Sequence, residues 1–459
     1  MLKDEVLNKL AEEGGNVAQF VSFGPKGQRF SRISGTNPDW VFNDGNSALE
    51  TLMAKSGNGR INIRTFLPDK PDGNPFKYDL DNVSQASEMV RQFIEQGFYI
   101  VVNENISITD GGFSGVLFGN LMEGAPGDTP RCVEKAGCMR LPRTLGFDLI
   151  KAVYGFPFHM PFKSTYRVEF SVHPHRVGYA QDKQVIWQAE EYDPALLPQA
   201  PEVEWPNRMS AAMGDKAYGL LMASVIGLPV PYTTVVSRMI PLFSFGEQIH
   251  SEEPDWVRTV PKIQTPGKFQ TIRGWKDPFA IMQEDDPDNS KIAAIIIQHG
   301  IKAHYSGSAI TDSNDKLILE GCRGYGDRFM TGNQAPEDLP SQVRGEVTFL
   351  YERIQEKIGG PARFEWVYDG RLAWNVQLHR SRTATAGNVI YPGLPKDWLA
   401  FNVESGLEAL RELTAKAQAE NLGIRVIGNV GLTSHFGDIL RKAKVPSTLT
   451  PKVSVEKSA

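Results

Sequence analysis

The residues from Met213 to Pro231, with the sequence MGDKAYGLLMASVIGLPVP, constrain the fold more than any other part of the chain. A Gly-Asp turn opens a predicted helix, Lys216 lies in its first turn, and apolar residues follow at helical spacing. Gly227 ends the helix, and two prolines prevent its continuation. A lysine beside the free N–H groups of a helix start can hold a phosphate. Without further context, the pattern favours a solvated lysine on an amphipathic helix.

Length and composition are those of a soluble globular protein. The 459 residues suffice for two or three domains, and 41% hydrophobic with 22% charged residues is ordinary for this class. The net charge of -5 argues against a general affinity for nucleic acid, and no apolar run reaches the roughly 18 residues of a membrane helix. We expect no nucleic-acid or membrane partner, and the oligomeric state is left open.

The N-terminus and the cysteines favour a cytoplasmic location. The first residues, MLKDEVLNKLAEE, have the pattern of a charged helix and not of a signal peptide. The three cysteines, Cys132, Cys138 and Cys322, are an odd and sparse set, which predicts reduced thiols. Cys132 and Cys138 lack the spacing and the nearby histidines of a zinc site.

Short motifs recur in the same order in the two halves of the chain. Five such matches predict a duplicated unit of roughly 150 residues, although strand-rich domains also produce tetrapeptide matches by chance. The pairs are 62–65 with 271–274, 98–103 with 293–298, 113–116 with 305–308, 133–137 with 319–324, and 167–170 with 363–366.

A proline-rich segment at 194–206 is the predicted linker between the halves. We therefore expect a mixed α/β protein with a first half at 1–205, a second half at 206–395, and a short C-terminal segment at 396–459. That segment has helical patterns near 404–420 and 434–444, with an apolar stretch between them that is typical of a strand.

The stretch from Phe364 to Gln377 is predicted to be a β-hairpin closed by Asp369-Gly370. The hairpin brings Glu365 and Gln377 onto adjacent strands. A carboxylate and an amide oxygen are hard ligands that suit Mg²⁺ carrying a nucleoside triphosphate. The alternative is an ordinary hairpin with exposed polar residues.

The C-terminal segment contains the sequence GLTSHFGDILRKAKVP, in which His435 opens a predicted helix. The helix dipole biases a histidine in a first turn toward the neutral, nucleophilic imidazole. The N–H groups of the same turn can stabilise a phosphoryl group placed there. The alternative is a Thr-Ser helix cap followed by a surface histidine.

Taken together, these motifs resemble the phosphoenolpyruvate synthase and pyruvate phosphate dikinase family. That family has a lysine eleven residues before Gly-Leu-Pro-Val-Pro, and Lys216 keeps this interval, with Asp215 in place of a glycine. Its ATP-grasp domain ends with Glu and, twelve residues on, Gln, an interval that Glu365 and Gln377 keep. The arginine that follows in the family is replaced by His379.

The C-terminal motif resembles the phosphohistidine motif of the same family. The family pattern is Gly-x-Thr-Ser-His, then an arginine and a proline, and His435, Arg441 and Pro446 match it at both intervals. Only 13 residues follow Pro446, fewer than in the swivelling histidine domain of the family, and the chain has no barrel for pyruvate or phosphoenolpyruvate.

The resemblance implies an ATP-grasp domain in the second half, with ATP and Mg²⁺ as cofactors. Glu365 and Gln377 would hold the metal. The implied nucleotide contacts are Lys216 and Arg273 on the phosphates, Gln298 beside the adenine, Glu320 and Asp327 in a weakly specific tract, and Arg380 in place of the displaced arginine.

In the first half, Glu169 and Gln188 echo Glu365 and Gln377 at a longer interval. No Gly-x-Lys helix is found before Arg64. We therefore predict a degenerate copy that does not bind ATP and that serves as a substrate or partner platform.

The activity that the resemblance implies is ATP-dependent phosphoryl transfer through His435, with conversion of ATP to AMP and with Arg273 assisting. The acceptor, a small molecule or a protein, is not identified. One alternative is an ATP-grasp ligase that forms an acyl phosphate and releases ADP. The other is an ATP-binding regulatory protein without turnover.

Overall fold

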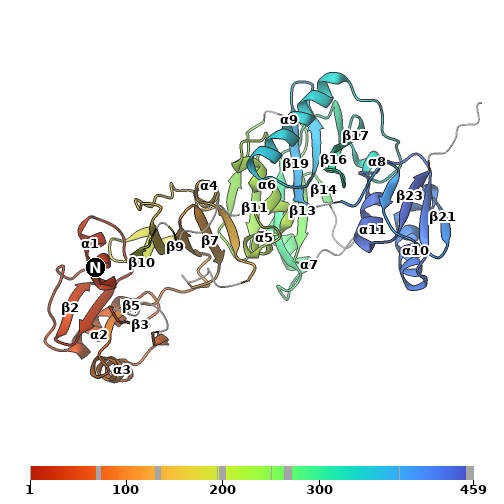
Figure 1. Cartoon of the computed structure of the whole chain (residues 1–459). Helices are drawn as coiled ribbons and strands as arrows, with labels where there is room; N and C mark the ends of the chain where they lie inside the picture. Colours follow the sequence, from red (N-terminus) through yellow and green to blue (C-terminus); the bar gives the residue numbers. More distant parts are fainter. Residues whose placement is uncertain are drawn as a thin grey trace, which may run out of the picture. The chain divides into compact units, whose positions relative to one another are not determined.

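The computed structural model describes residues 2–450 except 69–73, 130–135, 194, 196–202, 250, 263–270 and 382. Its helices and five β-sheets confirm the mixed α/β class predicted from the sequence (Figure 1). The chain forms two compact units. Unit 1 comprises residues 1–212 and 237–241, and unit 2 comprises residues 213–236 and 242–459. Most of the predicted linker and Cys132 lie outside the described residues.

The first sheet of unit 1 has the strand order β2-β1-β5-β3-β4. Two helices cover it and bury an aliphatic core that includes Leu49 and Ile100. Both helices begin at a side-chain cap, because Asp44 and Asn82 each accept a hydrogen bond from the backbone N–H three residues ahead. The elements are β1 (Phe20–Gly24), β2 (Gly27–Arg32), α2 (Gly45–Lys55), β3 (Ile61–Phe66), β4 (Phe76–Leu80), α3 (Val83–Glu95) and β5 (Tyr99–Glu104).

The second sheet of unit 1 has the order β10-β9-β6-β7-β8. The N-terminal helix α1 (Lys3–Glu12) packs on β10, the edge strand of this sheet. The remaining elements are β6 (Phe113–Phe118), β7 (Leu121–Pro126), β8 (Met139–Pro142), α4 (Arg143–Tyr154), β9 (Tyr166–Val177) and β10 (Asp182–Glu191), followed by α5 (Arg208–Met213).

The first sheet of unit 2 has the order β12-β11-β15-β13-β14. Helix α6 (Asp215–Val225) precedes it, at the place where the sequence predicts a helix. The other elements are β11 (Thr233–Ser237), β12 (Phe243–Phe245), β13 (Trp256–Pro261), β14 (Thr271–Arg273), α7 (Pro278–Asp285) and β15 (Ile292–Gln298).

The second sheet of unit 2 has the order β17-β16-β18-β19, and α6 packs on its edge strand β19. The predicted hairpin is formed by β18 and β19. Asp369 closes it by accepting hydrogen bonds from the backbone N–H groups of Arg371 and Leu372, at 2.8 and 3.0 Å. The elements are β16 (Tyr305–Thr311), β17 (Leu317–Arg323), α8 (Asp327–Met330), α9 (Ser341–Lys357), β18 (Ala362–Tyr368) and β19 (Ala373–Arg380).

The C-terminal part of unit 2 is a small lobe with a hydrophobic core of its own, which we call the C-terminal lobe (residues 389–450). Its sheet has the order β20-β23-β22-β21. The two helices predicted from the sequence are present and pack on each other. The elements are β20 (Val389–Tyr391), β21 (Trp398–Asn402), η2 (Val403–Ser405), α10 (Gly406–Glu420), β22 (Gly423–Ile427), α11 (His435–Ala443) and β23 (Ser447–Thr450).

Strand order supports the predicted duplication. The order β2-β1-β5-β3-β4 of unit 1 recurs as β12-β11-β15-β13-β14, and β10-β9-β6-β7 recurs as β19-β18-β16-β17. The hairpins β9–β10 and β18–β19 also share a β-bulge, at Trp187 and Val376. Since topology, register and bulge agree, we infer that the two units descend from one repeat.

Three of the five motif pairs lie on corresponding strands, namely β5 with β15, β6 with β16, and β9 with β18. The pairing of 62–65 with 271–274 is wrong, because β3 corresponds to β13 and not to β14. An Ile-Arg dipeptide occurs in many alternating strands and is too short to identify one of them. The match at 133–137 lies partly outside the described residues.

Candidate nucleotide site in unit 2

The two sheets of unit 2 enclose a pocket of about 100 Å³. Side chains from β13 and β15 line one wall, and side chains from β16, β18 and β19 line the other. The polar lining residues with the chemistry of a nucleotide site are Arg258, Gln298, Asp327 and Glu365.

Glu365 and Gln377 face each other across β18 and β19, as predicted. The Gln377 Nε2 donates to Glu365 Oε1 at 3.2 Å. The residues of β18 alternate between buried and partly buried, so Glu365 lies on the open side of the sheet. The bulge at Val376 brings Gln377 to the same side. Glu365 therefore lines the pocket, and Gln377 lies beside it on the same side of the sheet.

Lys216 lies in the first turn of α6, which packs on β19. Helix α6 starts at Gly214, where φ is +83° and a Cβ would lie 2.1 Å from a methyl carbon of Val260, so only glycine fits. Burial and the charge of Arg258 lower the pKa of Lys216, whereas Glu365 raises it. Within the described parts of the chain, no hydrogen bond or ion pair of the Lys216 ammonium is found.

Arg258, and not Arg273, is the arginine of the pocket. Burial lowers the pKa of Arg258, opposed by the charges of Glu365 and Asp327. Arg273 lies on the edge strand β14, where it forms an ion pair with Glu253 at 2.9 Å and its guanidinium lies over the ring of Tyr325.

Two further residues named from the sequence, Gln298 and Asp327, line the pocket. Gln298 ends β15, lines the pocket and donates to Thr233 Oγ1 at 3.4 Å. Asp327 opens α8 and also lines the pocket. Arg258 thus has carboxylates of two different elements near it, Asp327 and Glu365.

Glu320 and Arg380 lie elsewhere. The carboxylate of Glu320 accepts three hydrogen bonds from the C-terminal lobe: from the backbone of Leu432 at 3.1 Å, and from the backbone and hydroxyl of Thr433 at 2.8 Å each. Glu320 therefore holds the lobe and does not face the pocket. Arg380 lies on the opposite side of β19 from Gln377, with its guanidinium against Gly360.

Arg363 and His379 form a second cross-strand pair beside Glu365 and Gln377. The pKa of His379 is lowered to about 3 by burial and by the positive charges of Arg363, Lys216 and Lys442. His379 is therefore neutral at physiological pH. The positive charges around His379 therefore extend from Lys216 to α11 of the C-terminal lobe, which carries Lys442.

Asp438 connects His435 to this group of positive charges, because it lies beside both His435 and Arg363. The His435 Nδ1 lies 3.5 Å from Asp438 Oδ2, and Asp438 also forms ion pairs with Arg363 and with Arg441. Burial alone would raise the pKa of Asp438, but Arg363, His435 and Arg441 lower it well below its usual range. Since Arg363 and Glu365 are alternate residues of one strand, their Cα atoms lie about 7 Å apart.

The residues present fit a nucleotide-bound Mg²⁺ better than a protein-bound metal. Among the described residues, no three His, Cys, Asp or Glu side chains form a group that could hold a metal ion. Glu365 and Gln377 offer two oxygen ligands, which suits an ion that arrives already bound to a nucleotide. None of the described helices is long and apolar enough to cross a membrane.

Comparisons with known proteins found similarity only to solved structures. No family model matches the sequence, and no curated protein does. The VanG D-Ala:D-Ser ligase of Enterococcus faecalis is 13% identical over 37% of this chain and 53% of its own, at a TM-score of 0.24. The D-alanine-D-alanine ligase of Helicobacter pylori is 10% identical over 38% and 53%, at a TM-score of 0.25.

The D-alanine-D-alanine ligase of Bacillus anthracis, in a structure with ATP, is 14% identical over 38% of this chain and 57% of its own, at a TM-score of 0.25. This chain therefore spans little more than half the length of the structures it matches. Similarities at this level assign neither a family nor an activity.

Proposed function

We propose that unit 2 binds Mg-ATP in the pocket between its two sheets and transfers a phosphoryl group to an acceptor. The observation that carries the proposal is the convergence of Lys216, Arg258 and the Glu365–Gln377 pair. These residues come from α6, β13 and the β18–β19 hairpin, elements that are far apart in the sequence. The resemblance to the ATP-grasp domain of the phosphoenolpyruvate synthase family supports the same conclusion.

Each residue has a role that follows from its charge and place. Gln298 is a buried residue of the pocket lining and suits the polar edge of a base. Lys216 and Arg258 neutralise the charge of the phosphates and the charge that develops as a phosphoryl group leaves. Glu365 and Gln377 would hold Mg²⁺, which would supply positive charge beside the phosphates.

Mg-ATP binding tests the proposal directly. We expect Lys216→Ala and Glu365→Ala each to weaken binding by roughly tenfold or more, because each removes a charged contact worth about 1.5–3 kcal/mol. Isothermal titration of the full chain with Mg-ATP measures the effect. Lys276→Ala is the matched control, since this exposed lysine pairs with Glu284 away from the pocket. Wild-type affinity in both site variants would refute the proposed site.

For the first acceptor we propose His435. If its Nδ1 carries the proton and faces Asp438, as the 3.5 Å separation favours, Nε2 is free to attack a phosphorus. The helix N-terminus and the arginines around Asp438 would stabilise the phosphorylated ring. The same pocket also suits a ligase, in which a bound carboxylate takes the phosphoryl group and ADP is released.

The adenine product separates the two routes. Transfer through His435 in the manner of the dikinase family predicts AMP and an acid-labile label from β-labelled ATP, both lost in His435→Ala. The ligase route predicts ADP, no protein-bound label, and an unchanged rate in His435→Ala. Chromatography of the nucleotides and base-quenched radiolabelling measure both. ATP that stays intact with every acceptor tried would favour the regulatory alternative.

A further inference from the structure

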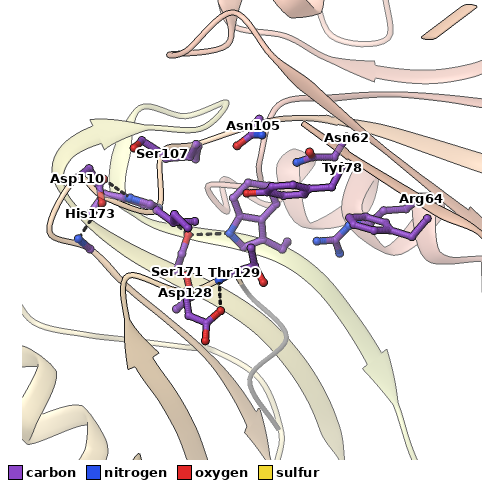
Figure 2. Close-up of a pocket in the computed structure, with 16 residues that line it drawn as sticks. Asn62, Arg64, Tyr78, Asn105, Ser107, Asp110, Asp128, Thr129, Ser171 and His173 are labelled. Atoms are coloured by element: carbon purple, nitrogen blue, oxygen red, sulfur yellow. Dashed lines mark hydrogen bonds and ion pairs between the residues drawn. The ribbon is translucent and has the colours of Figure 1, made fainter. Parts of the chain in front are cut away.

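The pocket between the two sheets of unit 1 has a volume of about 290 Å³ and contains a continuous chain of hydrogen bonds (Figure 2). The Trp187 Nε1 lies 2.7 Å from Ser171 Oγ, and Ser171 Oγ lies 2.7 Å from His173 Nε2. His173 Nδ1 lies 2.6 Å from Asp110 Oδ2. All four residues line the pocket.

The chemistry of the end groups fixes the direction of these bonds. A carboxylate only accepts, so His173 Nδ1 carries the proton and donates to Asp110. In the neutral imidazole the other ring nitrogen, Nε2, is an acceptor, and the Ser171 hydroxyl then donates to it. An indole N–H only donates, so Trp187 donates to Ser171 Oγ. Asp110 is held in turn by the backbone N–H of Gly112, which donates to its other oxygen at 2.7 Å.

This arrangement is that of an activated serine. The nucleophile hydroxyl points its proton at an imidazole whose far nitrogen is held by a carboxylate, which is the logic of a Ser-His-Asp triad. The three residues come from two parts of the chain, because Ser171 and His173 are alternate residues of β9 and Asp110 precedes β6.

The fold does not require these residues. In unit 2, Val367 takes the register position of Ser171, since Ser114 pairs with Ser171 as Ser306 pairs with Val367. Val376 takes the bulge position of Trp187. Unit 2 therefore builds the same hairpin with apolar side chains, and the hydrogen-bonded chain belongs to the pocket of unit 1.

We propose that Ser171 is a nucleophile for acyl transfer from small uncharged esters. The walls favour such a substrate, because Phe76, Tyr78 and Ile108 supply apolar and aromatic surface. The charged groups of the lining are engaged within the protein: Arg64 with Glu169 at 3.1 Å, and Asp128 with Arg208. An anionic substrate would find no unopposed cation among the described lining residues.

The reaction has two balanced steps. Ser171 Oγ attacks the ester carbonyl while His173 Nε2 takes its proton, and the bond to the alcohol breaks as His173 returns that proton to the leaving oxygen. Water then attacks the acyl-serine in the same way, which releases the acid and restores Ser171. Asp110 stabilises the imidazolium in both steps. The Trp187 N–H that contacts Oγ lies beside the attacked carbon and can donate to its oxyanion.

Covalent labelling tests the inference on the full chain. Phenylmethylsulfonyl fluoride should form one adduct on Ser171, located by peptide mass spectrometry. Asp110→Asn should slow labelling by roughly 10²-fold or more, because the imidazole then loses the partner that fixes its tautomer. Hydrolysis of p-nitrophenyl acetate should fall in parallel in Asp110→Asn and in Ser171→Ala. Ser114→Ala is the matched control, because Ser114 is a second serine of the same pocket.

Two outcomes would overturn the inference: absence of an adduct on Ser171 in the wild type, or equal labelling rates in wild type and in folded Asp110→Asn. Circular dichroism reports whether the variant is folded. The labelling does not depend on the nucleotide proposal, because all four residues of the hydrogen-bonded chain belong to unit 1. Failure of one proposal therefore leaves the other standing.

Discussion

Units 1 and 2 place the same types of side chain at the same strand positions, but they use them differently. Helix α1 packs on β10 as α6 packs on β19, and both helices have a lysine in the first turn. For the other residues, the pairing of corresponding strands shows which positions of unit 1 and unit 2 are equivalent. The corresponding pairs are Lys3 and Lys216, Arg64 and Arg258, Arg167 and Arg363, Glu169 and Glu365, and Gln188 and Gln377.

In unit 1 these charges neutralise one another. Lys3 Nζ lies 2.5 Å from Glu190 Oε1. Glu169 forms ion pairs with Arg64 at 3.1 Å and with Arg167 at 2.8 Å. In unit 2 the position of Glu190 is taken by His379, which is neutral. Unit 1 thus has a carboxylate paired with its lysine at the position where unit 2 has an imidazole.

The largest expected effect comes from the two corresponding arginines. Arg258→Ala should weaken Mg-ATP binding by about 2–3 kcal/mol, or roughly 30- to 150-fold, because it removes a buried cation from the phosphates. Arg64→Ala should leave Mg-ATP affinity unchanged and should instead lower the free energy of unfolding by about 1–3 kcal/mol, because the buried Glu169 then loses its ion pair with Arg64. Calorimetric titration and urea unfolding of both variants measure the two effects.

Arg273→Ala is the control for this comparison. Arg273 is half-exposed on an edge strand and pairs with Glu253, so its removal should change Mg-ATP affinity by less than about threefold. A larger loss in Arg273→Ala than in Arg258→Ala would restore the assignment made from the sequence. A loss of affinity in Arg64→Ala would show that unit 1 takes part in nucleotide binding.

Local sequence patterns are sufficient to predict several secondary-structure elements of unit 2. The hairpin from Phe364 to Gln377 and the helix that carries Lys216 were found because turn residues and apolar periodicity are local signals. The sequence interpretation named Arg273 and did not consider Arg258, which lines the pocket, since a short arginine-containing strand does not reveal which strand is central. Glu320 was predicted beside the nucleotide, but its partners belong to a lobe more than 100 residues further along the chain.

Unit 1 was harder to interpret from the sequence. Its lysine helix was missed because it is the N-terminal helix, whose Lys3 follows no glycine turn. The Ser171, His173 and Asp110 chain was also missed. Its residues are ordinary strand and loop residues, and only the pairing of β6 with β9 brings Asp110 to His173. Both omissions have one physical cause, which is that tertiary register and not local pattern decides which side chains meet.

The smallest expected difference between the two units concerns the pH dependence of stability. We expect His379 to make the free energy of unfolding of unit 2 depend on pH. Its pKa is about 3 in the folded protein, below the value of 6.5 for an unperturbed histidine. Between these values the unfolded chain binds one more proton, so the free energy of unfolding falls as the pH falls, by up to about 1.4 kcal/mol per unit. Unit 1 has Glu190 at this position and lacks that histidine.

Urea unfolding at about pH 6.5 and about pH 5 tests this contribution. His379→Gln should lose up to about 2 kcal/mol less stability over this interval than the wild type, because glutamine binds no proton in either state. His159→Gln is the control, since His159 is an exposed histidine of unit 1, and its replacement should leave the wild-type dependence in place. If His379→Gln loses as much stability on acidification as the wild type, His379 is not held neutral by Arg363 and Lys216, and the difference between the phosphate ends of the two units has another origin.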